Sequence, residues 1–325
     1  MGGRLAYDLV EVTNDIKEID DQGFWAVSST FEGEWICAKF ERVVDAPLPA
    51  SEEKWVPLKG MWVSTHDRSE YMNYVGRIRE EISLGWVYQV NACRQLSLSF
   101  SNESLLPLMH EILKLNPAPY ASYLRLPNLE IASASPELFL KREGQILLSA
   151  PIKGTKNLKD NEKAFGEKDR AENIMIVDLI RNDLGRICET GTVRVPELLQ
   201  SQDHPGLVHL VSYIEGKLSP DRSWEEIMNA ILPPGSVSGA PKSSALSTIK
   251  NMETMPRGPY CGALGWIEGD HALLSVAIRI FWNTKDAHLR FGTGAGITWG
   301  SDASGEWEET ELKARRLISI AGGQL

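Results

Sequence analysis

The sequence lacks a long apolar segment, a run of basic residues and any closely spaced cysteines. Because no stretch reaches about 18 apolar residues, we expect no transmembrane helix and no membrane partner. The 34 Lys and Arg against 44 Asp and Glu give a formal net charge of −10, which argues against nucleic acid as a partner. The four scattered cysteines and the absence of a signal-peptide pattern predict reduced thiols in a cytoplasmic protein.

The apolar content is nevertheless high, at 42% of 325 residues, which is enough for a large buried core. Alternating apolar and polar residues predict a β-hairpin within 23–43 and a second one around Arg142-Glu143-Gly144. Helical periodicity predicts helices over 68–84, with Asp67 as N-cap, and over 171–186, 224–232, 241–251 and about 305–321. Strand-rich stretches interrupted by helices indicate one α+β domain over residues 1–325.

A lysine stands between an apolar strand and a Gly-Thr turn, in Ala150-Pro151-Ile152-Lys153-Gly154-Thr155. An ordinary surface lysine is one interpretation. The alternative is a lysine whose pKa is lowered by desolvation, which makes it a nucleophile near neutral pH.

Two acidic segments are candidates for a metal site. On a helix, Glu172 shares a face with Ile176 and with Leu179 or Ile180, and an ionised carboxylate that faces a core needs a cation. Glu306 and Glu309 share a face of the last predicted helix. Carboxylates from two helices suit Mg²⁺, although a dipole-favoured first turn and an exposed Glu309–Lys313 pair explain the same residues.

Two glycine-rich segments, 233–242 and 292–296, match neither the P-loop nor the dinucleotide-binding pattern. Each is typical of a tight turn, or of a backbone that presents N–H groups to an anion. The second segment also lies within a stretch, 288–299, that the sequence pattern predicts as a strand.

Nine short segments occur in the order found in one enzyme family: YQVN (88–91), SPELF (135–139), PIKGT (151–155), KDRAENIMIVDLIRNDLGR (168–186), HLVS (209–212), SGAPK (238–242), AIR (277–279), GAGI (294–297) and EETELK (308–313). With these segments the chain resembles the chorismate-utilising enzymes, which include anthranilate, aminodeoxychorismate, isochorismate and salicylate synthases. The resemblance implies two layered antiparallel β-sheets with helices outside and the active site in a central cleft. It also implies a shortened β-rich part at 1–66 and a catalytic core at 67–322.

The resemblance assigns roles to residues by their place in these motifs. It implies Glu172 and Glu309 as Mg²⁺ ligands, with Glu306 acting through water, and Lys153 and Glu137 as catalytic nucleophile and general acid. The implied substrate contacts are Gly154, Thr155, Arg279, Tyr260, Gly294, Ala295, Gly296, Gln89 and His209.

Two positions distinguish the subfamilies. Members that add water to chorismate are similar to this chain but carry a lysine where Gln89 stands, whereas anthranilate synthases usually have PIAGT where this chain has PIKGT. The chain therefore resembles most the aminodeoxychorismate synthases, which serve folate and para-aminobenzoate biosynthesis. Anthranilate synthase component I is the alternative enzyme, and a non-catalytic chorismate-binding homologue is the alternative of another class.

The resemblance also implies a source of ammonia. Relatives take it from a glutamine amidotransferase subunit, and this sequence has no such module, since Cys93 lacks the glycines that surround an amidotransferase nucleophile. We therefore expect an amidotransferase partner in trans.

Overall fold

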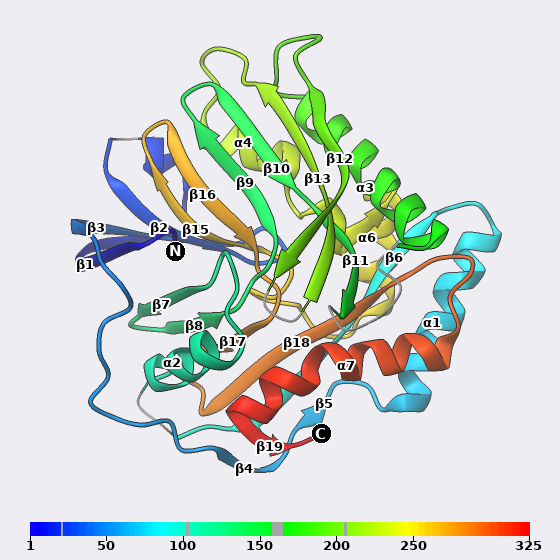
Figure 1. Ribbon diagram of the computed structural model, residues 1–325, viewed down its shortest axis with the longest axis horizontal. Coiled ribbons are helices and arrows are strands. Elements are labelled where there is room, and N and C mark those ends of the chain that lie inside the picture. Colours follow the sequence, from blue (N-terminus) through cyan, green and yellow to red (C-terminus); the bar gives the residue numbers. More distant parts are fainter. Residues whose placement is uncertain (21, 102–103, 158–164, 205–206) are drawn as a thin grey trace.

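The computed structural model describes residues 1–20, 22–101, 104–157, 165–204 and 207–325 (Figure 1). Two antiparallel sheets contain most of the described strands. The larger sheet has the order β1 (Arg4–Thr13), β3 (Trp35–Asp45), β2 (Phe24–Ser29), β15 (Ala263–Glu268), β16 (His271–Val276), β9 (Leu138–Glu143), β10 (Ile146–Ala150), β13 (Leu207–Lys217) and β11 (Ile152–Asn157), with β12 (Arg194–His204) also paired to β13.

The smaller sheet has the order β14 (Gly239–Ala240), β6 (Gln89–Ser99), β18 (His288–Ile297), β17 (Ile280–Asn283), β8 (Leu129–Ser133) and β7 (Ser122–Leu126), with β5 (Val63–Ser64) also paired to β6. A short parallel pair joins β4 (Leu58–Met61) to β19 (Gly322–Gln324). The helices are η1 (Ile16–Asp20, a 3₁₀ helix), α1 (Arg68–Ser83), α2 (Leu106–Leu115), α3 (Glu167–Gly185), α4 (Trp224–Ile231), α5 (Gly235–Ser238), α6 (Lys242–Met252) and α7 (Ala303–Ala321).

The two sheets share one hydrophobic core, which includes Trp25 and Val27 of the larger sheet and Ala92 and Ile297 of the smaller one. A second core lies on the other face of the smaller sheet, where α2 and α7 cover it. Figure 1 shows α7 running along β18, and α3 lying beside β12 and β13 of the larger sheet. The predicted fold class, two layered antiparallel sheets with helices outside, is confirmed.

Local sequence explains why α1 starts at Arg68. The Asp67 carboxylate accepts a hydrogen bond from the Glu70 N–H, and the Glu70 carboxylate accepts one from the Asp67 N–H, so both ends of a capping box are present. Tyr71 and Ile78 follow at helical spacing and are buried. Both predicted hairpins are also found, as β2–β3 and β9–β10.

The N-terminal strands join the larger sheet through β2 and β15, so they are continuous with the rest of the molecule. In the part of the chain that the structure describes, no helix is long and apolar enough to cross a membrane. The single-domain arrangement and the cytoplasmic location stay predictions.

Candidate active site

The candidate site lies where β11, at one edge of the larger sheet, meets β6 and β18 of the smaller sheet. Helices α3 and α7 lie beside these strands, with α3 against β11 and α7 against β18. The site residues therefore come from segments that are far apart in the sequence.

Lys153 is on β11 and is partly buried. Its Nζ donates a hydrogen bond of 3.1 Å to the carbonyl oxygen of Ser236, which belongs to α5. Burial lowers the pKa of Lys153, and this outweighs the opposite effect of the Glu172 carboxylate. The surface-lysine interpretation is therefore wrong, because this amine is withdrawn from solvent.

Glu137 precedes β9 and is buried, with 4% of its surface exposed. Burial raises its pKa to about 7, although the Ser236 hydroxyl, the charge of Lys153 and the Ile152 N–H all favour its ionised form. A carboxyl group with this pKa exchanges protons near neutral pH, as a general acid must.

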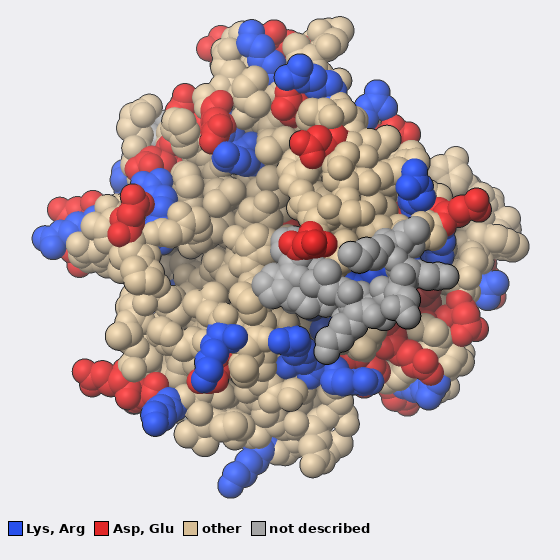
Figure 2. Space-filling model, viewed as in Figure 1, with Lys and Arg blue, Asp and Glu red and all other residues tan. Residues whose placement is uncertain are grey.

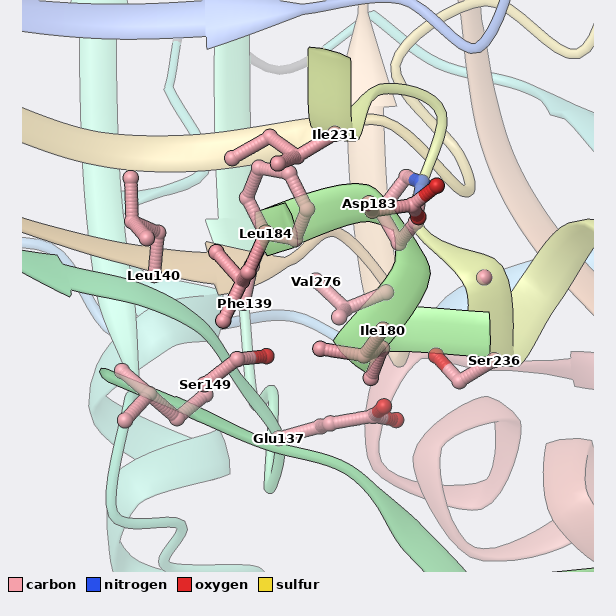
Figure 3. A pocket seen from close by; sticks show the side chains of 13 residues that line it. Glu137, Phe139, Leu140, Ser149, Ile180, Asp183, Leu184, Ile231, Ser236 and Val276 are labelled. Atoms are coloured by element: carbon pink, nitrogen blue, oxygen red, sulfur yellow. The ribbon is translucent and has the colours of Figure 1, made fainter. Parts of the chain in front are cut away.

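Glu137 is one of the residues that line a pocket (Figure 3). Glu137 and Ser236 line one side, and Asp183 lies on another, with Ile180 and Val276 among the apolar residues around them. Lys242 Nζ pairs with the Asp183 carboxylate at 2.5 Å and donates to the Ile231 carbonyl. The lysine of the SGAPK segment is thus committed to a largely buried ion pair.

Gln89 is the first residue of β6, and its side chain approaches that of Lys153 next to Gly296 of β18. A Cβ at Gly296 would clash with Gln89 Nε2 at 2.3 Å and would make an ordinary contact with Lys153 Nζ at 3.6 Å, so glycine at this position leaves room for the Gln89 amide near Lys153. The Oε1 atom of Gln89 is buried and has no hydrogen-bond partner among the described residues. Because an unsatisfied buried acceptor is costly, this oxygen is a candidate contact for a ligand.

Segment 292–296 is not a loop but part of β18. Its small residues allow other side chains and strands to pack closely against it. A Cβ at Gly292 would collide with the Tyr260 ring at 2.1 Å, and one at Gly294 would lie 2.6 Å from the Ala92 carbonyl oxygen. Ala295 is buried opposite Ala92. The tight-turn interpretation of this segment is therefore wrong.

Arg279 precedes β17 and has φ of +56°, a left-handed conformation that is strained for a residue with a side chain. The described residues provide no hydrogen-bond or ion-pair partner for its guanidinium group. Burial lowers the pKa of Arg279, and this outweighs the opposite effect of Tyr260. Such a strained, unpaired cation is well suited to bind a carboxylate from a ligand.

The three candidate metal ligands face one another from two helices. Lys168 Nζ lies 3.9 Å from Oε1 of Glu172 on α3 and 3.9 Å from Oε1 of Glu306 on α7. Burial raises the pKa values of Glu172 and of Glu306, and in both cases the nearby Glu309 charge adds to the rise. The three carboxylates therefore form one electrostatic group.

Magnesium needs hard oxygen ligands but usually only one or two protein carboxylates, with waters and substrate oxygens completing its shell. No group of three or more His, Cys, Asp or Glu within the described ranges could by itself hold a metal ion. Glu172 and Glu306 already attract a cation, the Lys168 ammonium, and Glu309 is close enough to raise the pKa values of both. The chemistry of these three carboxylates therefore fits a magnesium site that the substrate completes.

Lys313 is a site residue that the sequence analysis interpreted only as half of an exposed ion pair. Its Nζ pairs with Glu309 at 2.6 Å and also donates to the Gly294 carbonyl at 2.9 Å. Burial favours a higher pKa for Glu309, but Lys313 outweighs it and the pKa is lowered. Only the contact with β18, which sequence spacing does not reveal, brings Lys313 into the site.

The remaining predicted substrate contacts, His209, Gly154 and Thr155, belong to β11 and β13. His209 is buried on β13, opposite Thr155 in the strand register, and Gly154 has a positive φ of 85° on β11. The side chain of Thr155 lies outside the described part of the chain. The roles of these residues, like the other assigned roles, stay predictions.

Comparison with known proteins identifies related sequences. The model of the chorismate binding enzyme family matches residues 15–319. Anthranilate synthase component 1 of Saccharolobus solfataricus is 36% identical over 266 residues, which cover 79% of this chain and 63% of that protein. Aminodeoxychorismate synthase component 1 of Bacillus subtilis is 32% identical over 282 residues, which cover 84% of this chain and 60% of that protein. This chain thus spans about three-fifths of the length of these relatives.

A solved structure has the same fold. Anthranilate synthase component I from Streptococcus pneumoniae superposes with a TM-score of 0.85 at 22% identity, covering 97% of this chain and 91% of the other. At this identity the likeness concerns the fold alone.

Proposed function

The chain belongs to the family of chorismate-binding enzymes, and on this premise we propose that it aminates chorismate at C4 to give 4-amino-4-deoxychorismate, as aminodeoxychorismate synthase component I does. The observation that carries the proposal is Lys153, an amine of lowered pKa that lies within the charge field of Glu137, whose own pKa is about 7. A neutral amine is a nucleophile and a protonated carboxyl group is an acid, so the pair supplies both groups that displacement of a hydroxyl requires.

The proposed reaction has two displacement steps. Lys153 forms a bond to C2, the double bonds of the ring shift, and the C4–O bond breaks as Glu137 gives its proton to the departing hydroxyl, which leaves as water. Ammonia then forms a bond to C4, the double bonds shift back, and the C2–N bond to Lys153 breaks. Lys153 leaves as a neutral amine, and the ammonium formed at C4 loses one proton, which restores the protonated form of Glu137.

The charges of the site agree with a dianionic substrate. With Glu137 protonated and Lys153 neutral, as the reaction requires, the charged site residues are three glutamates (Glu172, Glu306, Glu309) and three cations (Lys168, Lys313, Arg279). Two carboxylates of chorismate added to this balanced set need two further positive charges. A Mg²⁺ ion held by Glu172 and Glu309, with Glu306 acting through water, would supply them and neutralise a substrate carboxylate.

Substrate orientation is assigned to residues of the smaller sheet. We assign Arg279 to one carboxylate of chorismate, because its guanidinium group has no partner among the described residues. The Gln89 and Lys153 side chains both approach Gly296, and we assign the unpaired Oε1 of Gln89 to the ammonia or to the C4 hydroxyl, both of which donate hydrogen bonds. The amide of Gln89 is not a base, which favours nitrogen chemistry over activation of water.

Ammonia is proposed to come from a glutamine amidotransferase subunit. All four cysteines of the chain are free and buried, so none is exposed as an amidotransferase nucleophile. We further propose a cytoplasmic role in folate or para-aminobenzoate synthesis.

Anthranilate synthase component I is the second candidate, supported by the 36% identity to the Saccharolobus solfataricus protein. Incubation of the chain with chorismate, ammonium and Mg²⁺, followed by mass spectrometry, separates the two. The proposal requires a product that retains the enolpyruvyl group and becomes para-aminobenzoate only when a lyase is added. Fluorescent anthranilate with free pyruvate would establish the alternative, and no turnover would favour a non-catalytic homologue.

A further inference from the structure

Lys168 occupies an unusual place between two helices. It lies one turn before Glu172 on α3, and Glu306 lies in the first turn of α7. The Lys168 ammonium is 3.9 Å from a carboxylate oxygen of each glutamate, so a single positive charge serves both. In the Mg²⁺ site proposed above, Glu172 is a direct ligand and Glu306 acts through water.

The other lysines of the site are committed elsewhere. Lys313 binds Glu309 and the Gly294 carbonyl, and Lys153 donates to the Ser236 carbonyl. Within the described chain, Lys168 therefore forms ion pairs with Glu172 and Glu306 and with no other carboxylate.

Lys168 is also held loosely. Both of its ion-pair distances exceed hydrogen-bond length, and 61% of its side chain is exposed, whereas the Glu306 side chain is only 5% exposed. A lysine on a flexible four-carbon stem can withdraw into water at little cost, while the nearly buried Glu306 must stay. The carboxylate pair is thus fixed and its counter-charge is movable.

A divalent cation and the Lys168 ammonium cannot both occupy this position. Mg²⁺ binds carboxylate oxygens at about 2.0–2.1 Å, which would put it within a few ångströms of the ammonium in a partly desolvated site. Repulsion between the two charges is strong at such a distance.

We propose that Lys168 is an internal competitor of the metal, which neutralises the Glu172–Glu306 pair in the metal-free protein and moves into solvent when the divalent cation binds. Its role is to keep the two helices together without metal and to limit metal affinity, so that tight binding requires the substrate carboxylate as well. This inference rests on the proposed metal site.

The test measures Mn²⁺ binding to the substrate-free protein by electron paramagnetic resonance, in the parent chain and in Lys168→Gln. The variant keeps a polar side chain and removes the competing charge. We expect its Kd for Mn²⁺ to fall by about three- to tenfold, the range expected when two weak ion pairs no longer have to be broken. Unchanged or weaker binding would overturn the proposal, as would an absence of Mn²⁺ binding in both proteins.

Lys217→Gln is the matched control, because this variant has the same change in net charge. Lys217 is the last residue of β13, and its Nζ forms one ion pair, with Glu189 at 2.8 Å. Its Kd for Mn²⁺ should equal that of the parent. Equal tightening in both variants would mean that overall charge sets the affinity, which contradicts a local competitor.

Thermal unfolding gives a second readout that a merely structural lysine would not produce. Lys168→Gln should unfold at a lower temperature than the parent in EDTA and at the same temperature in saturating Mg²⁺. An equal deficit in both buffers would overturn the proposal. Neither measurement depends on turnover, so failure of the proposed amination is recognised separately, by the product assay.

Discussion

Glu137 and Lys153 are joined through one residue, Ser236. The Ser236 carbonyl accepts a hydrogen bond from Lys153, and the Ser236 hydroxyl donates a hydrogen bond to the Glu137 carboxylate. The acid and the amine therefore share a fixed scaffold, the short helix α5, and each one's charge affects the pKa of the other. This coupling makes the proposed reaction dependent on pH.

Glu137→Gln should lower kcat with chorismate and ammonium by about 10²- to 10⁴-fold, because the amide cannot protonate the leaving hydroxyl. In the parent enzyme, activity should decline as pH rises above about 7, where Glu137 ionises. The measurement is kcat against pH at a constant concentration of free ammonia. Retention of the alkaline decline in the weakly active variant would exclude Glu137 as its cause.

The same residue should control stability. The pKa of Glu137 is about 7 in the folded protein and 4.5 for an unperturbed glutamate, so its contribution is fully present below pH 4.5 and is lost as pH rises through 7. Glu137→Gln, which mimics the protonated form, should therefore be more stable than the parent at pH 8, by up to about 3 kcal/mol, and equally stable near pH 4.5. Urea denaturation at both pH values measures the difference. An equal difference at both would contradict a buried proton on Glu137.

Gly296→Ala should abolish most activity while the chain still folds. The new methyl group would lie 2.3 Å from Gln89 Nε2, so the buried Gln89 side chain would have to leave the position that the proposal requires. Gly300→Ala is the control, since a Cβ there meets nothing within 4 Å. Circular dichroism should show the same fold in both variants, and turnover should be lost in Gly296→Ala only. Full activity in Gly296→Ala would show that the position of Gln89 is not needed for the reaction.

Arg279→Lys should raise KM for chorismate by about tenfold to a hundredfold, since a charge-assisted hydrogen bond to a carboxylate contributes about 1.5–3 kcal/mol. The unpaired guanidinium group is not needed to neutralise another described side chain, so the melting temperature should change little. Initial rates at varied chorismate concentration measure the effect. A large loss of stability with unchanged KM would indicate a structural arginine.

Asp183→Ala should destabilise the fold by about 3–5 kcal/mol, because Lys242 would be left largely buried without its partner. Asp178→Ala removes the Asp178–Arg181 pair from the exposed face of the same helix and should cost less than about 1 kcal/mol. Chemical denaturation of both variants compares them directly. Equal effects would mean that burial of the Asp183 pair has no energetic consequence.

The elements with strong local signals were predicted from the sequence. The Asp67 cap and the apolar residues of α1 are local features, as is the alternation in the two hairpins. Helix α2 received no prediction. Pro107 stands in its first turn, where proline is tolerated because the N–H it lacks would have no helical partner.

The sequence predicts which residues belong to the site, but it does not predict how they are arranged in space. Motifs identified Lys153, Glu172 and Glu309, whereas spacing along the chain carries no information about which strands and helices meet. The contact of Lys313 with Gly294, the approach of Gln89 to Lys153 and the shared position of Lys168 are all long-range. The sequence predicts the strand that contains Gly292–Gly296, but the packing of Gly292 against Tyr260 is a long-range contact as well.

The most direct test of the central claim is intact-protein and peptide mass spectrometry of the chain after incubation with chorismate and Mg²⁺ without ammonia, compared with Lys153→Ala. A nucleophilic Lys153 predicts an adduct equal to chorismate less one water, located on the peptide that contains residue 153, absent from the variant and discharged by ammonium. Rapid amination by Lys153→Ala, together with no adduct in the parent, would contradict the proposed covalent route.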